Sequence, residues 1–445
     1  MKTMMQRFVN NRKFKDVLFV IWAGGTALLT YSLVYTLRKP FTAALYSDLE
    51  LWGIDYKIAV TTIQIIGYLI AKFIGIKLIS ELKRENRLKF FALSVVVALL
   101  SLVAFAVIPV PYNAFALFFN GLSLGCMWGV IFSYIEGRRV TDMLASMLGV
   151  SIIISSGMAK SLGLFVMNEL GVDQFWMPAT IGAAALPLLF LMAYSLTKLP
   201  DPDHSDIHHK CERKTLNGAE RKEVFFKYFS ILALILAANF LITMLRDIKE
   251  DFLVNILDMS GESSWMFARV DTIVTIIILT LFALSNIVKR NFTVLVTFLL
   301  LSIASMGVMS YISLYHVQLN LSPVVWLFAQ SLPLYIGYLT FQTIFFDRFI
   351  ACFKIEGNVG FFIAIMDFAG YLGTVIILFT KDMFSQGMNW FELYNKMALY
   401  VGLFSVVMFS SALVSLVVTY RNEKNGVKKQ QIQPQPVEAE LGLSI

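Results

Sequence analysis

Residues 17–37 read VLFVIWAGGTALLTYSLVYTL, and Arg38 follows them at once. Residues 228–245, YFSILALILAANFLITML, are likewise followed by Arg246. A helix needs about 20 apolar residues to span a bilayer, so each stretch is long enough. A charged side chain within a membrane is costly and usually faces a protein interior or a water-filled cavity. The two stretches therefore predict one spanning helix in each half of the chain, with both arginines directed at a common site.

The composition excludes a soluble protein. Of the 445 residues, 58% are hydrophobic and only 15% are charged, against roughly 25% charged residues in a soluble domain. Backbone polar groups in lipid must be satisfied internally, and the long uniform apolar runs fit helices rather than the alternation of a barrel.

We expect an all-α membrane protein with twelve transmembrane helices in two pseudo-symmetric six-helix bundles. The predicted spans cover about residues 16–46, 57–80, 89–109, 112–135, 144–168, 176–198, 226–257, 265–288, 292–314, 322–346, 355–380 and 393–420.

A polar stretch near the middle of the chain separates six of these spans from the other six. We therefore expect an N-terminal bundle at 1–198, a cytoplasmic linker at 199–225 and a C-terminal bundle at 226–420. Residues 421–445 are polar, with Gln and Pro, and predict a disordered cytoplasmic tail.

Basic residues, Lys and Arg, are concentrated on one side of the predicted membrane topology. They gather at the N-terminus, in every second loop and in the tail, whereas the intervening loops are acidic or nearly uncharged. The positive-inside rule then places both termini in the cytoplasm of a multi-pass protein of the inner (plasma) membrane. The net charge of +7 is a consequence of this topology and does not indicate a nucleic-acid partner.

Charged residues inside the predicted spans are the candidate site. Arginine suits phosphate or carboxylate, because its planar fork donates two parallel hydrogen bonds. Cations outnumber anions deep in the spans, which favours a small, multiply charged anionic solute. The cations are Arg38, Lys39, Lys72, Lys160 and Arg246, the deep anions are Asp271 and Asp367, and Asp247, Glu250 and Asp251 lie nearer a helix end.

Structural alternatives exist for these charges. Arg38 lies about 31 Å along a helix from Val17 and could snorkel to the outer interface. The apolar run that resumes after Arg38, and the repetition at Arg246, favour a site instead. For Lys160 and Asp367, a structural ion pair between packed helices would explain the sequence equally well.

The sequence offers little support for a metal site or an enzyme active site. His204, His208, His209 and Cys211 resemble metal ligands, but they lie in the polar linker, so we expect no metal site and no cofactor. The sequence has no Walker A loop, nucleophile elbow or metalloprotease helix, so we expect no enzyme and a process driven by a gradient or by exchange.

Several segments together resemble the organophosphate:phosphate antiporters of the major facilitator superfamily, the group of the glycerol-3-phosphate and hexose-phosphate transporters. The resemblance covers most of the helices. The family's helix-five His is replaced by Ile152, and Lys160 and Asp367 have no counterpart. The matching segments are Tyr35-Thr36-Leu37-Arg38-Lys39-Pro40-Phe41, Lys72-Phe73-Ile74, Phe119-Asn120-Gly121, Leu245-Arg246 with Asp251, Ser263-Ser264-Trp265 with Asp271, and Gly370-Tyr371-Leu372-Gly373.

This resemblance implies a secondary transporter that carries a phosphorylated solute by alternating access, as an antiporter. We expect it to be monomeric. Arg38, Arg246 and Lys72 would bind the solute. Ion pairs that open and close would come from Lys39, Asp271, Asp251, Lys160 and Asp367, with Lys72–Asp367 and Lys160–Asp271 as candidate contacts between the halves.

Two other classes remain open at this stage. A membrane sensor would bind a phosphorylated ligand with the same fold and without transport, as some members of the resembled family do. An integral-membrane enzyme acting on lipid head groups would need an acid–base constellation at one membrane face, for which only the paired Asp and Lys residues offer a hint.

Overall fold

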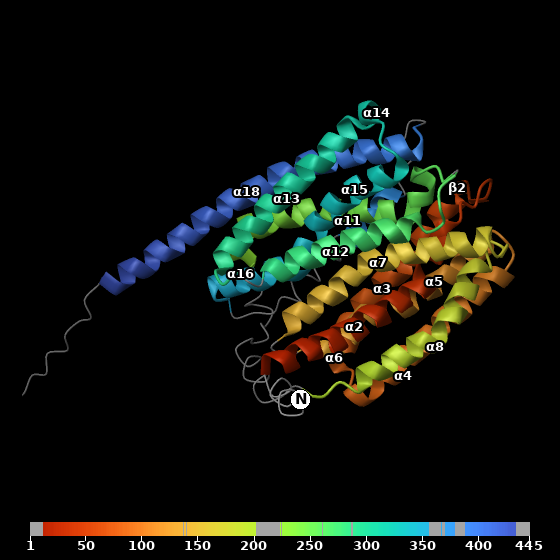
Figure 1. Ribbon diagram of the computed structural model, residues 1–445, viewed down its shortest axis with the longest axis horizontal. Coiled ribbons are helices and arrows are strands. Elements are labelled where there is room, and N and C mark those ends of the chain that lie inside the picture. Colours follow the sequence, from red (N-terminus) through yellow and green to blue (C-terminus); the bar gives the residue numbers. More distant parts are fainter. Residues whose placement is uncertain are drawn as a thin grey trace, which may run out of the picture.

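The computed structural model is built almost entirely of long helices that run roughly alongside one another (Figure 1). It describes residues 12–136, 138, 140–201, 223, 225–259, 261–285, 288–355, 366, 370–378 and 388–432.

The N-terminal half forms six spans joined by short connections. A two-stranded hairpin, β1 (Glu50–Leu51) and β2 (Ile54–Asp55), lies between the first two spans. The helices are α2 (Arg12–Arg38), η1 (Pro40–Ala43), α3 (Tyr56–Glu81), α4 (Arg84–Val107), η2 (Tyr112–Phe115), α5 (Ala116–Leu124), α6 (Met127–Ile135), α7 (Thr141–Asn168) and α8 (Met177–Thr197).

The C-terminal half repeats this arrangement in the described residues. Its helices are α11 (Phe229–Ile256), α12 (Met266–Ser285), α13 (Asn291–Leu314), the short α14 (His316–Leu319), α15 (Pro323–Leu339), the π-helical turn η3 (Thr340–Ile344), α16 (Phe345–Phe353) and α18 (Trp390–Ile432).

Eleven helical segments among the described residues are long and apolar enough to cross a membrane. The all-α, multi-pass architecture predicted from the sequence is therefore confirmed. The remaining predicted span, 355–380, falls largely outside the described residues; within it, residues 370–378 are helical.

The first predicted span, 16–46, is wrong in its extent. The α-helix ends at Arg38, and the chain continues as the 3-10 turn η1. Pro40 explains the ending, since proline lacks an N–H and disfavours helical geometry in the residue before it. The same half-turn leaves Lys39 at the point where the backbone changes course.

The C-terminal tail also differs in part from its prediction. Helix α18 continues beyond Arg421 to Ile432, where a disordered segment was predicted from 421. Glu423 stabilises this extension by accepting a hydrogen bond from Tyr228 at 2.9 Å and pairing with Lys227 at 3.0 Å. Residues 433–445 and most of the predicted linker, including the His and Cys residues at 204–211, lie outside the described residues.

The two halves lie side by side, with α7 running along α12 between them (Figure 1). Gly157 of α7 permits this close approach, because a Cβ there would stand 2.5 Å from a carboxylate oxygen of Asp271 on α12. Further along the same helices, Ser161 accepts a hydrogen bond from the backbone N–H of Ala268 at 3.0 Å. Small residues thus bring the halves into direct backbone contact.

Candidate functional site

Arg38 lies at the C-terminal end of α2 with its side chain turned into the protein. Only 4% of the residue is exposed. Its guanidinium carbon lies 3.8 Å from the ring centre of Tyr68 and 5.5 Å from that of Tyr35. A snorkelling side chain would be exposed at the helix end, so the burial of Arg38 contradicts that alternative.

Two side chains of neighbouring helices fix the end of α2. Gln64 of α3 donates to the carbonyl of Arg38 at 2.8 Å, and Asn120 of α5 donates to the carbonyl of Leu37 at 3.0 Å. These carbonyls have no partner within the helix, so the two amides cap it from the side. Gly121 makes the cap possible, because a Cβ there would lie 2.1 Å from the carbonyl oxygen of Gln64.

Arg246 lies inside α11 and is also buried, with 3% of the residue exposed. Its guanidinium forms an ion pair with Asp247 and lies 3.9 Å from Glu250. The ring centre of Tyr338 on α15 lies 4.1 Å from its guanidinium carbon. Thr374 holds the second oxygen of Asp247 with a 2.7 Å hydrogen bond. Arg246 is therefore charge-compensated within its own half.

The two guanidinium groups lie at a similar depth. The ring of Tyr68 contacts the guanidinium of Arg38. At 1.5 Å per residue, Tyr68 is about 18 Å along α3 from the start of that helix at Tyr56. Arg246 is about 15 Å along α11 from its end at Ile256. Both of these helix ends lie beside the β1–β2 hairpin, since β2 leads directly into α3 and Lys57 of α3 contacts Asn255 of α11. We call this side of the molecule the hairpin face. Each distance is about half of a 30 Å hydrocarbon core.

Tyr371 links the two arginines. It lies on the helical segment 370–378, with its ring centre 5.2 Å from that of Tyr68 and 4.7 Å from the Lys72 ammonium. Its hydroxyl is within electrostatic range of Lys72, Arg38 and Arg246. The predicted solute-binding residues Arg38, Arg246 and Lys72 thus gather around one aromatic cluster, formed by Tyr35, Tyr68, Tyr338 and Tyr371.

Nearer the hairpin face, polar contacts join the two halves. Lys39 of η1 forms an ion pair with Asp251 of α11. Lys57, at the start of α3, donates to the side-chain oxygen of Asn255 at 2.6 Å. The structure therefore brings together two of the residues predicted to form ion pairs that open and close.

Lys160 and Asp271 lie on the facing helices α7 and α12, but no ion pair joins them. The Lys160 ammonium donates to the Ser156 hydroxyl at 2.6 Å. Asp271 instead lies against Gly157, nearly a turn away along α7. The predicted direct contact is wrong for this conformation, because the Ser156 hydroxyl takes the ammonium. Asp367, and with it the predicted Lys72–Asp367 contact, lies outside the described residues.

Three buried residues of the site were not singled out from the sequence: Lys57, Gln64 and Lys249. Lys249 lies over the ring of Tyr335 at 4.4 Å. The sequence Arg246-Asp-Ile-Lys-Glu-Asp251 holds the missing signal, since five charges in six residues of an apolar helix cannot all face lipid. Lys57 gives no such signal, because it lies at the start of a helix, where a lysine at the membrane interface is as good an explanation as a functional site.

The buried charges in the described part of the chain have an excess of cations. Among the described residues, six buried cations face four buried anions. A net positive interior of this kind is costly unless an anion joins it. The cations are Arg38, Lys39, Lys57, Lys160, Arg246 and Lys249, and the anions are Asp247, Glu250, Asp251 and Asp271.

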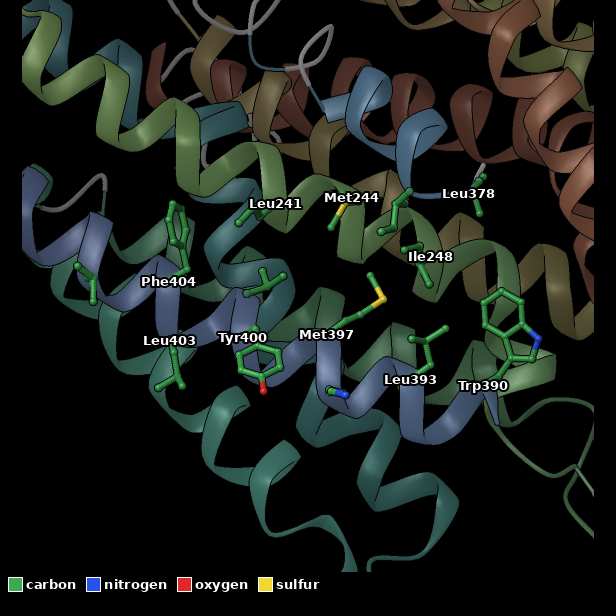
Figure 2. A pocket seen from close by; sticks show the side chains of 14 residues that line it. Leu241, Met244, Ile248, Leu378, Trp390, Leu393, Met397, Tyr400, Leu403 and Phe404 are labelled. Atoms are coloured by element: carbon green, nitrogen blue, oxygen red, sulfur yellow. The ribbon is translucent and has the colours of Figure 1, made fainter. Parts of the chain in front are cut away.

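A separate apolar pocket of about 800 Å³ lies between α11 and α18 (Figure 2). Met244 and Ile248 line it, each two residues from Arg246 and therefore about 200° around the helix from it. Trp390 and Tyr400 of α18 form part of its opposite wall. The pocket is on the other face of α11 from the arginine, and apart from Lys396 its lining is almost entirely apolar.

The sequence model of the Family of unknown function (DUF5690) matches residues 40–419. No curated protein sequence matches the chain.

Solved transporter structures share the fold. A D-xylose-proton symporter superposes with a TM-score of 0.56 at 14% identity, covering 87% of this chain and 96% of the other. An inward-open xylose transporter XylE from E. coli gives 0.55 at 12% identity, with 87% and 95% covered. A variant of the nucleoside transporter NupG gives 0.53 at 15% identity, with 89% and 99% covered. At such identities the likeness establishes the fold, which is that of the major facilitator superfamily.

Proposed function

We propose that this chain, which belongs to the Family of unknown function (DUF5690) and has the fold of the major facilitator superfamily, is a secondary transporter of a small anionic solute. The solute class that fits best is a phosphorylated compound or phosphate itself. Transport would proceed by alternating access to a site between the halves, the general mode of transporters built from two repeated bundles.

The observation that carries this proposal is the environment of Arg38. Its guanidinium is buried against tyrosine rings, and no described carboxylate forms an ion pair with it. Its Nε has no hydrogen-bond partner among the described residues. A buried cation left in this way is expensive, and an anionic ligand would compensate it. Arginine's fork matches the oxygens of a phosphate group.

Arg246 would complete the site from the other half. Asp247 and Glu250 already share its charge, so the anion would compete with these carboxylates for the guanidinium. Because of that competition, the anion would bind conformations with a broken Arg246–carboxylate pair more tightly than conformations with an intact one. Such a difference in affinity is what a ligand needs in order to shift a conformational equilibrium. Lys72, beside Tyr371, would add a third positive charge.

Access to the site requires the halves to separate on one face. The Lys39–Asp251 pair and the Lys57–Asn255 hydrogen bond hold them together towards the hairpin face. These contacts would break when that face opens and re-form when it closes. The orientation that we propose, with both termini in the cytoplasm, makes the hairpin face the outer one.

The experiment is counterflow of labelled phosphate and of sugar phosphates in vesicles that contain the purified protein. Arg38→Lys and Arg246→Lys each keep the charge but remove the fork, and we expect each to reduce uptake at least tenfold. Arg269→Lys is the matched control, because Arg269 is exposed and should transport normally. Normal transport by both site variants would refute the two-arginine site, and ligand binding without flux would favour a sensor.

A further inference from the structure

Helices α11 and α18 touch near both membrane faces and part between these contacts. Near the hairpin face, the rings of Phe252 and Trp390 stack with their centres 4.4 Å apart. Towards the opposite face, the hydroxyls of Ser230 and Ser415 lie 2.8 Å apart. The pocket of about 800 Å³ occupies the interval between the two contacts (Figure 2). It is therefore bounded at both ends by the fold, unlike an ordinary groove on a lipid-facing surface.

The walls of this pocket suit a long apolar chain. Leu241, Met244 and Ile248 form the α11 wall (Figure 2). The lining residues of α18 extend from Trp390 to Val407, a length of about 26 Å, which is most of the roughly 30 Å hydrocarbon core. The volume lies within the range of pockets that hold ligand-sized molecules, and methionine side chains adapt to flexible ligands. The pocket thus has the length and the lining for one acyl chain.

Among the described residues that line the pocket, Lys396 alone is charged. It lies about 9 Å along α18 from Trp390, so its exposed side chain can extend to the level at which tryptophans meet lipid head groups. No described carboxylate forms an ion pair with it. Glu392, one turn nearer the start of the helix, does not line the pocket. A lysine beside an acyl-length pocket supplies the charge that binds a phosphate.

We propose that this pocket is a specific site for an anionic phospholipid from the leaflet at the hairpin face. Its phosphate binds Lys396, and one of its acyl chains lies between α11 and α18. The site does not depend on the transport function proposed above, because the pocket is on the face of α11 opposite to Arg246.

The test is thermal unfolding of the purified protein in detergent, titrated with phosphatidylglycerol or with phosphatidylcholine that has the same acyl chains. We expect half-maximal stabilisation at an about tenfold lower concentration of phosphatidylglycerol, because only its net negative charge is left to pair with the ammonium. Equal concentrations for the two lipids would overturn the proposal, since the pocket would then take any phospholipid.

Lys396→Met should unfold at the native temperature in detergent alone and should lose the preference for phosphatidylglycerol. Lys396→Arg should keep the preference. The matched control is Lys289→Met, which removes an exposed lysine outside the pocket and should also keep it. A preference that survives in Lys396→Met would overturn the placement of the head group.

Filling the pocket tests the placement of the acyl chain. Met397 lies in the space between the two helices (Figure 2). Met397→Trp should occupy that space and weaken stabilisation by both lipids. Unchanged stabilisation in this variant would overturn the binding of a chain between α11 and α18.

Photolabelling of the native protein decides the same point if the tryptophan variant does not fold. Phosphatidylglycerol with a photoreactive group midway along one chain should label residues 241–248 and 393–407, and excess phosphatidylglycerol should suppress this labelling more than excess phosphatidylcholine does. Leu300, exposed on α13, should show no such preference. Equal suppression by the two lipids would overturn the proposal. Unlabelled segments would also overturn it, and a dimer in light scattering would then assign the pocket to a second copy of this chain.

Discussion

Lys39 and Asp251 form a buried ion pair across the two halves of the molecule, although 212 residues separate them in the sequence. Lys39 follows the end of α2, at the turn that Pro40 enforces, and Asp251 lies beside the kink of α11 at Phe252. Each partner thus stands where its helix departs from regular geometry. The pair is positioned to respond to rocking of the halves.

Removing one partner of this pair should be costly. Lys39→Met leaves Asp251 as a buried, uncompensated carboxylate, which we expect to destabilise the fold by about 3–5 kcal/mol. Adding Asp251→Leu should recover most of that stability, since an apolar pair avoids the desolvation of two charges. Thermal unfolding of the purified variants measures both effects. The control is Lys396→Met, because Lys396 is exposed on α18; equal stability of Lys39→Met and this control would contradict a buried pair.

Locking the hairpin face should stop transport. Lys57 and Asn255 touch through the long lysine side chain, so a flexible linker suits this pair better than a direct disulfide, which needs closely spaced backbones. We therefore expect a short bifunctional thiol reagent to bridge Lys57→Cys and Asn255→Cys, in a background without Cys126, Cys211 and Cys352. Bridging should abolish counterflow, whereas the same reagent on either single cysteine should leave it intact. Full activity of the bridged protein would show that these contacts need not separate.

Glycine at position 157 should be indispensable. A Cβ there would lie 2.5 Å from Asp271 Oδ2 and 2.7 Å from the carbonyl oxygen of Phe267. Gly157→Ala must push α7 and α12 apart, and overpacking of this kind costs about 1–3 kcal/mol. Gly25→Ala is the matched control within α2, since nothing lies within 4 Å of its Cβ position. The control should be neutral or stabilise the protein by up to about 1 kcal/mol.

Thermal unfolding of these two alanine variants in the same lipid distinguishes the sites. Equal midpoints for Gly157→Ala and Gly25→Ala would mean that the close approach of α7 to α12 does not limit stability.

The sequence was sufficient to predict the helical fold, because each membrane-spanning helix is visible as an apolar stretch of the right length. It was also sufficient to select Arg38 and Arg246, since a guanidinium within such a stretch needs a reason to be there. The sequence could not supply their partners. Arg246 pairs with the adjacent Asp247, which looked like a residue nearer the helix end, whereas Arg38 is surrounded by tyrosines from three segments.

Side-chain competition explains why the Lys160–Asp271 contact was not predictable. Both residues lie on the helices that were expected to face each other, and both are buried. A serine one turn before Lys160 captures its ammonium, and a glycine receives the carboxylate. The symmetry of the fold predicts which helices are neighbours. Which of several nearby polar groups a side chain then contacts depends on details of packing that cannot be read from one sequence.

Asn120 should act on solute binding without touching the solute. It donates to the carbonyl of Leu37, and Gln64 donates to its side-chain oxygen at 2.8 Å. Asn120→Asp keeps the acceptor for Gln64 but removes the donor and turns an oxygen towards the carbonyl. We expect about 1–3 kcal/mol of destabilisation from the carbonyl left unsatisfied. Because that carbonyl belongs to the turn that positions Arg38, we also expect a higher KM for phosphate uptake.

The control for this substitution is Asn320→Asp, which makes the same chemical change at an exposed residue in a left-handed conformation that both side chains tolerate. Thermal unfolding and the KM of uptake, measured together, separate two roles for Asn120. A loss of stability with an unchanged KM would limit the amide to packing. A loss of stability accompanied by a raised KM is the result expected of an amide cap that holds Arg38 in place.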